Sequence, residues 1–330
     1  MAAARCRLCD HVEGNRTFEA REMLLGTRER FTYLACAGCQ ALSIEPEPER
    51  VDAYYPREYY AAPPDSALGV PGWAGTMMGG PVASLLAVGK QRGPGLERYL
   101  AGRAFAFYLA PLGLAPDARI LDVGCGDGGF LRALALLGFE RGCGLDPLVD
   151  PARLMDTGSS VRRVSLFELE PEPAWDLVML HHSFEHMPAP AEALARVAAL
   201  LRPGGTCLLR VPLVPCFAWE RYGVDWIGLD APRHFVIHSP RSLRRLADAA
   251  GLRIARVLHD STSLQFWGSE LYARDVALYA DLPPLRKLAL ACGEDGERFP
   301  LAKLTAMELR AQQLNREGTG DQAAFYLVKG

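Results

Sequence analysis

The chain has no excess of positive charge. Its 330 residues include 36 Lys and Arg against 39 Asp and Glu, which gives a formal net charge of -3 at pH 7. A protein that binds nucleic acid usually needs a basic surface to neutralise phosphates. We therefore expect no nucleic-acid partner.

Long apolar runs are absent as well. A membrane-spanning helix needs about 20 predominantly apolar residues, and no stretch of the sequence approaches that length. The segment 1–7 lacks the apolar core that a secretory signal requires. These absences predict a cytoplasmic protein with no membrane partner.

Repeats and low-complexity segments are also missing. Hydrophobic residues make up 49% and charged residues 23% of the chain, which is the balance of an ordinary globular protein. A chain of this length has room for one large domain and a small accessory unit.

The nine cysteines are odd in number, and five of them are scattered singly. The other four form two C-x-x-C pairs, Cys6 with Cys9 and Cys36 with Cys39, separated by 26 residues. Four thiolates can surround Zn²⁺ tetrahedrally, and such a closed site makes the metal structural. The alternative is four free thiols or a redox pair. We predict a zinc ribbon over residues 1–45.

A run of proline and acidic residues at 45–49 predicts a boundary, because proline disfavours helix in the residue before it. Residues 46–96 would form a linker with helical and aromatic character. Its tyrosines, Tyr54, Tyr55, Tyr59 and Tyr60, either cover the active site or form an interdomain core. We prefer the core.

From residue 97 onward, short apolar runs alternate with amphipathic segments. Strands are expected at 119–123, 142–145, 161–166, 175–180, 206–211, 252–258 and 323–328. Helices are expected at 97–112, 129–138, 190–201 and 242–250. Such alternation predicts an α/β fold, a doubly wound and mostly parallel seven-stranded sheet over 97–330, with an insertion at about 262–320.

A glycine-rich loop follows the first of these strands. Gly124, Gly126 and Gly129 satisfy G-x-G-x-x-G, the fingerprint of dinucleotide-binding folds. Asp122, however, stands just before the first glycine, where a carboxylate suits an ammonium group better than a pyrophosphate. Asp146 ends the second strand and could bind ribose hydroxyls of either kind of cofactor.

The run 121–128 resembles motif I of class I S-adenosylmethionine-dependent methyltransferases, which have a Rossmann-like fold. Segments 175–188 and 201–205 are similar to the fourth strand with its loop and to the turn into the fifth strand of that family. The other interpretation is a doubly wound fold that binds a different nucleotide.

The resemblance implies S-adenosylmethionine as cofactor. Asp122, Gly124 and Gly126 would hold its methionine part and Asp146 its ribose. Phe167 would border the adenine, and His181 would lie beside the cofactor. The full set of expected cofactor residues is Asp122, Gly124, Cys125, Gly126, Asp146, Phe167 and His181.

Methyl transfer requires an aligned nucleophile and a base that removes its proton. The loop after the fourth strand offers His182, Glu185 and His186, which either act in catalysis or anchor the next helix. A second group, Asp230 and His234, follows the fifth strand among aromatic residues. We prefer His234 as the base, the alternative being a core histidine that orders its loop.

The stretch 230–234 resembles bacterial methyltransferases associated with sugars and surface polysaccharides. Two further segments, 265–272 and 315–322, either line an acceptor pocket or fasten the insertion to the domain.

Three functions follow from these patterns. The first is methyl transfer to a hydroxyl or carbon of a small polar acceptor, a sugar or nucleotide-sugar in carbohydrate biosynthesis. The second is an RNA methyltransferase whose zinc module binds the nucleic acid, against which the charge balance argues. The third is a non-catalytic binding protein that keeps the fold, against which the intact glycine loop argues.

Overall fold

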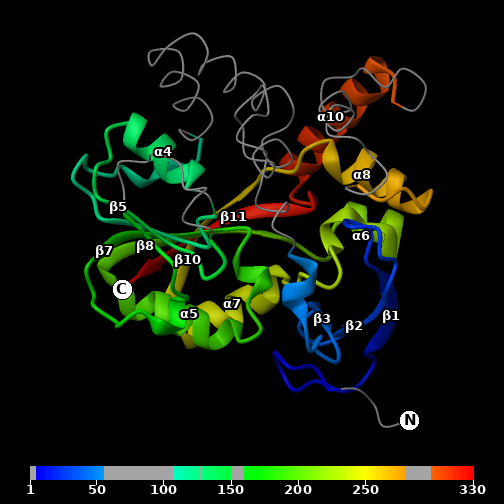
Figure 1. Cartoon of the computed structure of the whole chain (residues 1–330), viewed down its shortest axis with the longest axis horizontal. Helices are drawn as coiled ribbons and strands as arrows, with labels where there is room; N and C mark the ends of the chain where they lie inside the picture. The colour runs from blue at the N-terminus through cyan, green and yellow to red at the C-terminus, as the bar shows by residue number, and fades with distance from the viewer. Residues whose placement is uncertain (1–4, 56–106, 127, 150–159, 279–298) are drawn as a thin grey trace.

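The computed structural model describes residues 5–55, 107–126, 128–149, 160–278 and 299–330. In this part of the chain, a large twisted sheet carries α4 on one face and α5 and α7 on the other (Figure 1). A smaller sheet lies beside it, formed mainly by the first 45 residues. Tyr59 and Tyr60, for which we predicted a place in an interdomain core, lie outside the described residues.

The described part of the large sheet has seven strands in the order β10-β11-β8-β7-β4-β5-β6. Only β11 runs antiparallel to its neighbours; the other pairs are parallel. The predicted doubly wound, mostly parallel seven-stranded sheet is therefore confirmed. The strand bounds are β4 (Ile120–Val123), β5 (Gly142–Leu145), β6 (Ser160–Arg162), β7 (Trp175–His181), β8 (Leu201–Pro212), β10 (Leu252–His259) and β11 (Gln322–Lys329).

Two predicted strand boundaries are wrong. The third strand ends at Arg162 and not at Leu166, because Ser165 and Glu168 form a capping box that starts a 3-10 turn. The fifth strand begins at Leu201, which pairs with Trp175 ahead of a register irregularity. The predicted turn at 201–205 thus lies inside β8, where residues 202–205 fall between the paired positions Leu201 and Thr206.

Three helices, α4, α5 and α7, lie close to their predicted positions, whereas α6, α8 and α10 were not predicted. The α-helices are α4 (Gly129–Leu136), α5 (Pro190–Leu200), α6 (Phe217–Tyr222), α7 (Pro240–Ala249), α8 (Leu264–Ala273) and α10 (Leu301–Glu317). The 3-10 turns are η1 (Val51–Tyr54), η2 (Ala110–Leu112), η4 (Leu166–Glu168), η5 (Phe184–His186), η6 (Gly223–Asp225) and η7 (Ile227–Leu229). Most of the helix predicted at 97–112 lies outside the described residues.

The core of the large sheet has two layers, one on each face. Strand β7 shows why: Val178 and Leu180 pack with the α5 side, whereas Leu177 and Met179 pack with the α4 side. All four side chains are fully buried. Since parallel strands are covered on both faces, they read as continuous apolar runs, which is what made them predictable.

The small sheet has the order β1-β2-β3-β9, with antiparallel pairing throughout its described strands. Its first three strands are β1 (Arg16–Arg21), β2 (Arg30–Ala35) and β3 (Leu42–Ile44), and the fourth is β9 (Val236–Ile237). Strand β9 comes from the second half of the chain. The amino-terminal segment therefore shares a sheet and a hydrophobic core with the larger domain.

Within the described residues, no helix is both long enough and apolar enough to cross a bilayer.

Candidate functional site

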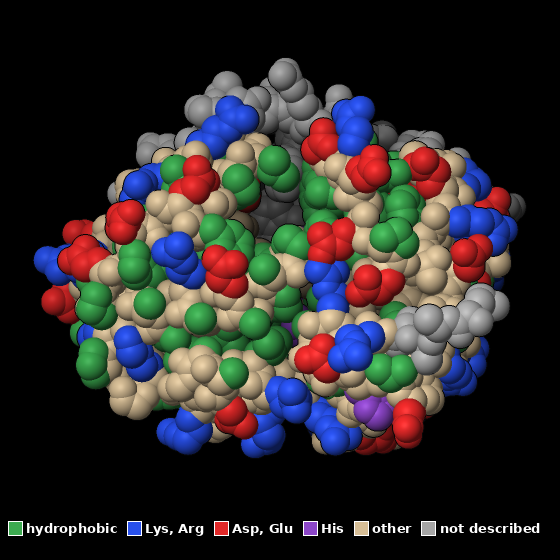
Figure 2. All heavy atoms as spheres, turned by 90° about the horizontal axis from the view of Figure 1, so that it is seen from below, with side chains coloured by type: hydrophobic (Ala, Val, Ile, Leu, Met, Phe, Trp, Pro, Cys, Tyr) green, Lys and Arg blue, Asp and Glu red, His purple; other side chains and the backbone are tan. Residues whose placement is uncertain are grey.

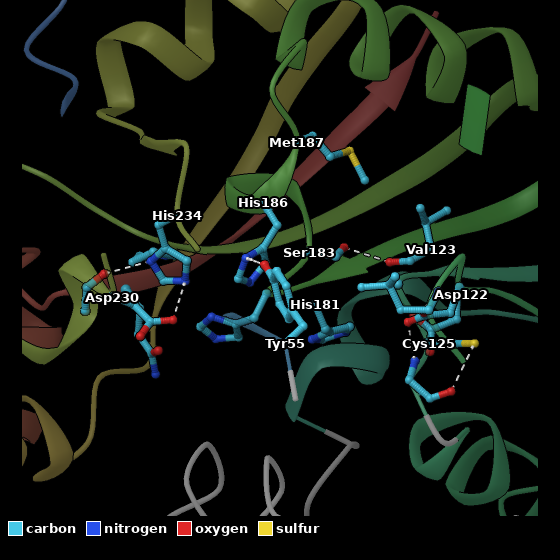
Figure 3. Close-up of a pocket in the computed structure, with 18 of the residues that line it drawn as sticks. Tyr55, Asp122, Val123, Cys125, His181, Ser183, His186, Met187, Asp230 and His234 are labelled. Carbon is cyan, nitrogen blue, oxygen red and sulfur yellow. Dashed lines mark hydrogen bonds and ion pairs between the residues drawn. The ribbon is translucent and has the colours of Figure 1, made fainter. Parts of the chain in front are cut away.

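A cavity of about 460 Å³ opens at the carboxyl ends of β4, β5 and β7. Strand β4 lies between β5 and β7, where the chain changes direction across the sheet. Doubly wound sheets bind their ligands at this point. Asp122 and Cys125 lie on one side of the cavity and His234 and Asp230 on the other, with His186 between them (Figure 3).

The backbone of the glycine loop approaches the neighbouring strand closely. Gly124 and Gly126 have φ angles of 77° and 54°, a region that favours glycine. A Cβ on Gly124 would lie 2.5 Å from the Cβ of Ser183 at the end of β7, whereas a Cβ on Gly126 would meet nothing within 4 Å. The loop is therefore tight against β7 and open where Gly126 borders the cavity.

The carboxylate of Asp122 is buried at the end of β4, with 3% of the residue exposed. No residue that the structure describes donates a hydrogen bond to this side chain. Burial, together with the charge of Asp146, raises the pKa of Asp122 to about 7. A buried carboxylate without a partner fits a cationic ligand group such as an ammonium.

Asp146, at the end of β5, joins the glycine loop to the second strand. One carboxylate oxygen accepts a hydrogen bond of 3.0 Å from the amide of Gly126, and the other accepts one of 2.8 Å from the amide of Leu148. Asp146 lines the cavity, and its carboxylate oxygens keep further lone pairs for ligand hydroxyls. The residue therefore fits the predicted ribose contact.

The other predicted cofactor residues also line this half of the cavity. Phe167 lies in the turn after the third strand. His181 ends β7 and stacks on Phe130 with ring centroids 4.4 Å apart. Cys125 points its sulfur toward Gly144 on β5, where a Cβ would lie 2.5 Å from it. Cys125 thus packs the loop against the sheet.

At the far end of β7, His182 has a φ of 50°, which is unusual for a residue other than glycine. Its Nδ1 lies 3.1 Å from Oε1 of Glu185. Glu185 is fully buried, and burial raises its pKa to about 8. Nε2 of His182 and Oε2 of Glu185 are buried without a partner among the described residues. Such a combination of strain and unsatisfied polar atoms is typical of functional sites.

Two more histidines face the same region. Nδ1 of His234 lies 3.0 Å from the carbonyl of Gly228, and Nδ1 of His186 lies 3.0 Å from the carbonyl of Arg233. The Tyr55 hydroxyl is 2.8 Å from the same His186 nitrogen. Burial lowers the pKa of His186 to about 3 and holds that of His234 below its usual value.

Buried ion pairs surround these histidines. Arg233 is fully buried and donates to Asp230 at 2.6 Å and to Glu22 at 3.0 Å. Burial alone would raise the pKa of Asp230, but the Arg233 guanidinium outweighs it and holds the pKa below its usual value. A second pair joins Arg210 to Asp260.

The structure brings the predicted residues after the fourth and fifth strands together. His234 Nε2 lies 3.9 Å from Glu185 Oε1 and 3.8 Å from Asp230 Oδ2. For the segments 265–272 and 315–322, we considered either lining a pocket or fastening the insertion to the domain, and the structure shows contacts of both kinds. Gln265 lines the cavity, whereas Asn315 makes two hydrogen bonds to the backbone of Ser261.

Several site residues were missed or misjudged from sequence. Tyr55 lines the cavity, which favours the alternative given for it, a residue that covers the site, over the interdomain core that we preferred. Ser183 donates a 2.7 Å hydrogen bond to the carbonyl of Val123 and fixes the loop on β7. Arg210 could have been recognised as a site residue, since it is a charged residue within an apolar strand. The sequence around Glu22 has no feature that would have identified it.

The four cysteines gather at one point of the small sheet. The sulfurs of Cys6 and Cys39 are 3.7 Å apart, and those of Cys9 and Cys36 are 3.5 Å apart. Zinc–sulfur bonds of about 2.3 Å in a tetrahedron place the sulfurs about 3.8 Å from one another. The donor set and its spacing therefore fit Zn²⁺.

The two cysteine turns repeat the same backbone pattern. The amide of Asp10 bonds to the carbonyl of Cys6, and the amide of Gln40 bonds to the carbonyl of Cys36. Asp10 and Gln40 have φ angles of 60° and 65°, which close each turn after its second cysteine. Two matching turns that bring four sulfurs together are what a closed tetrahedral zinc site requires.

The strand order, the glycine loop and the buried Asp122 all correspond to one family. Residues 96–257 match the family described as "Methyltransferase domain". This chain contains a class I methyltransferase domain. The finding confirms the coarser part of the resemblance seen in the sequence.

Curated relatives match part of the chain. The "Ubiquinone biosynthesis O-methyltransferase" of Xanthomonas campestris pv. campestris (strain B100) is 37% identical over 138 residues, which cover 38% of this chain and 57% of that protein. The "Trans-aconitate 2-methyltransferase" of Methylobacterium nodulans is 32% identical over 117 residues, 33% of this chain and 44% of that protein. The chain thus spans about half the length of these curated relatives.

Solved structures give a weaker likeness. A SAM dependent methyltransferase from Archaeoglobus fulgidus is 20% identical, and the match covers 73% of this chain and 96% of that one with a TM-score of 0.44. This value carries no argument about function.

Proposed function

We propose that the protein transfers the methyl group of S-adenosylmethionine to a small polar acceptor. The observation that carries the proposal is a single cavity, lined at one end by the buried Asp122, which has no hydrogen-bond partner among the described residues, and at the other by His182 and His234. When bound, the cofactor supplies an electrophilic methyl group on a sulfonium. The acceptor atom gains the methyl group and loses a proton, and the sulfonium becomes a thioether.

Residues of the glycine loop would hold the cofactor. The Asp122 carboxylate would pair with its ammonium, and Gly126 leaves open space beside it. Asp146 would accept hydrogen bonds from the ribose, and Phe167 would border the adenine. In a site of this kind, alignment of donor and acceptor supplies much of the rate enhancement.

We assign removal of the acceptor proton to His182. Its Nδ1 is oriented by Glu185, and its Nε2 has no partner among the described residues. This pairing of a histidine with a buried carboxylate is a recurrent way to orient a general base. His234, the first choice from sequence, is the second candidate, because its Nε2 faces Glu185 and Asp230.

A sugar or nucleotide-sugar is the first candidate acceptor. The cavity lining includes Gln265, Asp230 and Gln322, whose side chains can bind hydroxyl groups. A phenolic acceptor is the second candidate, because Leu24, Ile227 and other apolar residues line the same half of the cavity. One relative is named as an O-methyltransferase of ubiquinone biosynthesis, which agrees with transfer to oxygen.

The charge distribution argues against the RNA methyltransferase alternative. On the face shown in Figure 2, basic and acidic side chains are interspersed. A nucleic-acid surface would gather basic residues. The intact glycine loop and the buried Asp122 argue against a non-catalytic binding protein, since an unpaired buried carboxylate lowers stability unless a ligand compensates it.

We also propose that the four cysteines bind one structural Zn²⁺. The sulfur spacing and the paired turns support this assignment. All four positions of the metal would be filled by protein, so the ion would take no part in methyl transfer.

The test begins with calorimetric titration of the purified protein with S-adenosylmethionine and with NAD⁺. Binding of the first alone, lost in Asp122→Asn, is the expected result, whereas binding of NAD⁺ alone would overturn the proposal. Transfer of radioactive methyl from S-adenosylmethionine is then measured with nucleotide-sugars and with catechols as acceptors. His182→Asn should lower this transfer by roughly a hundredfold and leave cofactor binding unchanged.

A further inference from the structure

Three side chains that can act as metal ligands lie close together at the acceptor end of the cavity. One atom each of Glu185, His186 and His234 lies within 4.8 Å of the other two. Glu185 is fully buried, and its Oε2 has no hydrogen-bond partner among the described residues. A buried carboxylate oxygen without a partner is costly, which indicates that a ligand completes the site.

The histidine tautomers point to the same conclusion. A carbonyl oxygen only accepts hydrogen bonds, so Nδ1 of His234 beside the carbonyl of Gly228 carries a hydrogen. The carbonyl of Arg233 favours the same tautomer in His186, whose Nδ1 also lies 2.8 Å from the Tyr55 hydroxyl. In a neutral imidazole, Nε2 then holds a lone pair. Metal-binding histidines typically donate their second ring nitrogen to a carbonyl or carboxylate in this way.

Glu185 stands apart from the buried ion pairs beside it. Arg233 pairs with both Glu22 and Asp230, and Arg210 pairs with Asp260. Glu185 has no guanidinium partner among the described residues, and burial raises its pKa to about 8. A bound cation would favour the ionised form of this carboxylate.

We propose that Glu185, His186 and His234 bind a divalent transition-metal ion. Two imidazoles and one carboxylate are a ligand set for such ions that leaves coordination positions open. Because metal–ligand bonds are about 2.1 Å long, two ligand atoms lie at most about 4.2 Å apart. The 3.9 Å between His234 Nε2 and Glu185 Oε1 falls within this limit.

The proposed ion deepens the proposed function, on which it rests. His186 and His234 line the cavity, so the open positions of the ion would face the acceptor. The ion would hold an acceptor oxygen and favour its deprotonated form. His234 would then serve as a ligand, and proton removal would belong to His182. Acceptors with two neighbouring oxygens would bind best.

The test uses Mn²⁺ on the full chain with its cysteine site loaded with zinc, because manganese prefers oxygen and nitrogen ligands to thiolates. Loss of the free Mn²⁺ signal in electron paramagnetic resonance reports binding. We expect one Mn²⁺ per chain, and at least tenfold weaker binding in Glu185→Gln and in His234→Asn. His259→Asn, outside the cavity lining, is the matched control and should bind as the parent protein does.

Unchanged Mn²⁺ affinity in folded Glu185→Gln would overturn the metal site, as would full methyl transfer after removal of weakly bound metal with a chelator. If His234→Asn does not fold, His186→Gln replaces it. Titration with S-adenosylmethionine separates the two proposals. Cofactor binding with metal-independent transfer overturns only the ion, whereas absence of cofactor binding overturns the methyltransferase function.

Discussion

The hydroxyl of Tyr33 on β2 donates a hydrogen bond of 2.8 Å to the backbone carbonyl of His234. Tyr33 belongs to the sheet that carries the cysteines, whereas His234 lines the acceptor end of the cavity. Both groups are buried, and burial raises the pKa of the Tyr33 hydroxyl far above its usual value. The hydroxyl therefore stays protonated as a donor, and the small sheet fixes the position of a site residue.

Tyr33→Phe removes this donor and leaves a buried carbonyl without its partner. We expect the free energy of unfolding to fall by about 1–3 kcal/mol. Affinity for S-adenosylmethionine should stay unchanged, while the KM for the acceptor rises. Ser43→Ala is the matched control, since the buried Ser43 hydroxyl has no partner among the described residues. A loss of cofactor affinity in Tyr33→Phe would contradict this division of the site.

Removal of metal from the cysteine site should affect the acceptor end and spare the cofactor end. The Cys39 carbonyl accepts a hydrogen bond from Ser239, which caps α7, and Arg7 donates to the carbonyl of Pro188 at the cavity. Loss of the proposed zinc ion would loosen these contacts, because the ion would hold the cysteine turns together. We expect Cys36→Ser to lose zinc and most methyl transfer but to retain cofactor binding. Metal analysis and calorimetry on the same sample provide the check.

Binding of S-adenosylmethionine should release protons near pH 7. Asp122 has a pKa of about 7 in the unliganded protein, and a bound ammonium favours the carboxylate and lowers that pKa. Affinity should therefore rise by up to about tenfold per pH unit between pH 5.5 and 7. Calorimetry in buffers of different ionisation enthalpy measures the released protons. Asp122→Asn should abolish both effects; an unchanged release would assign the proton to another group.

The raised pKa of Asp122 also has a consequence for stability. Its folded pKa lies above the unfolded value, so the folded state binds more protons between about pH 4 and 7. Asp122 therefore favours the folded state less as pH rises through this window. Saturation with cofactor should reverse the trend, and thermal unfolding with and without ligand measures the difference.

Gly124→Ala should prevent cofactor binding at a modest cost in stability. The new Cβ would lie 2.5 Å from that of Ser183, so the loop or the end of β7 must move. Gly113→Ala is a matched control, because Gly113 also has a positive φ of 56° but its Cβ would meet nothing within 4 Å. Both variants carry the backbone cost of about 1 kcal/mol. Only Gly124→Ala should weaken binding, by at least tenfold; equal weakening in both would refute the packing argument.

Arg233→Met should destabilise the protein by about 3–5 kcal/mol, because Glu22 and Asp230 are left as buried charges without their partner. Arg202→Met provides the comparison. Its pair with Asp176 is partly exposed, with 50% of the Arg202 side chain and 22% of the Asp176 side chain accessible, and should contribute about 0–1 kcal/mol. Chemical denaturation of both variants measures the difference, and similar values would show that the buried pair is dispensable.

Much of the large sheet could be predicted from sequence because its parallel strands are short apolar runs followed by glycine or aspartate. The third strand was drawn too long although a signal was present. Ser165 and Glu168 have the spacing of a capping box, which starts a new turn. The apolar residues Val164 and Leu166 flank Ser165 and made the segment look like a continuation of the strand.

The site was predictable only where local motifs carry it. The glycine loop and the cysteine pairs are such motifs, since their chemistry depends on neighbours in sequence. Tyr55, Glu22 and Asp260 reach the site through tertiary contacts with His186, Arg233 and Arg210. Strand β9 belongs to the same class, because its two residues form a strand only by pairing with β3.

Because β3 pairs with β9, the small sheet cannot be completed until much of the chain has been synthesised. Ser43 leaves the ribosome long before Val236, its partner in the sheet. At usual rates of translation, β3 waits roughly 10 to 40 s as an open sheet edge, and such edges invite pairing with other chains. The segment that carries β1, β2 and β3 is therefore synthesised well before its sheet can be completed by β9.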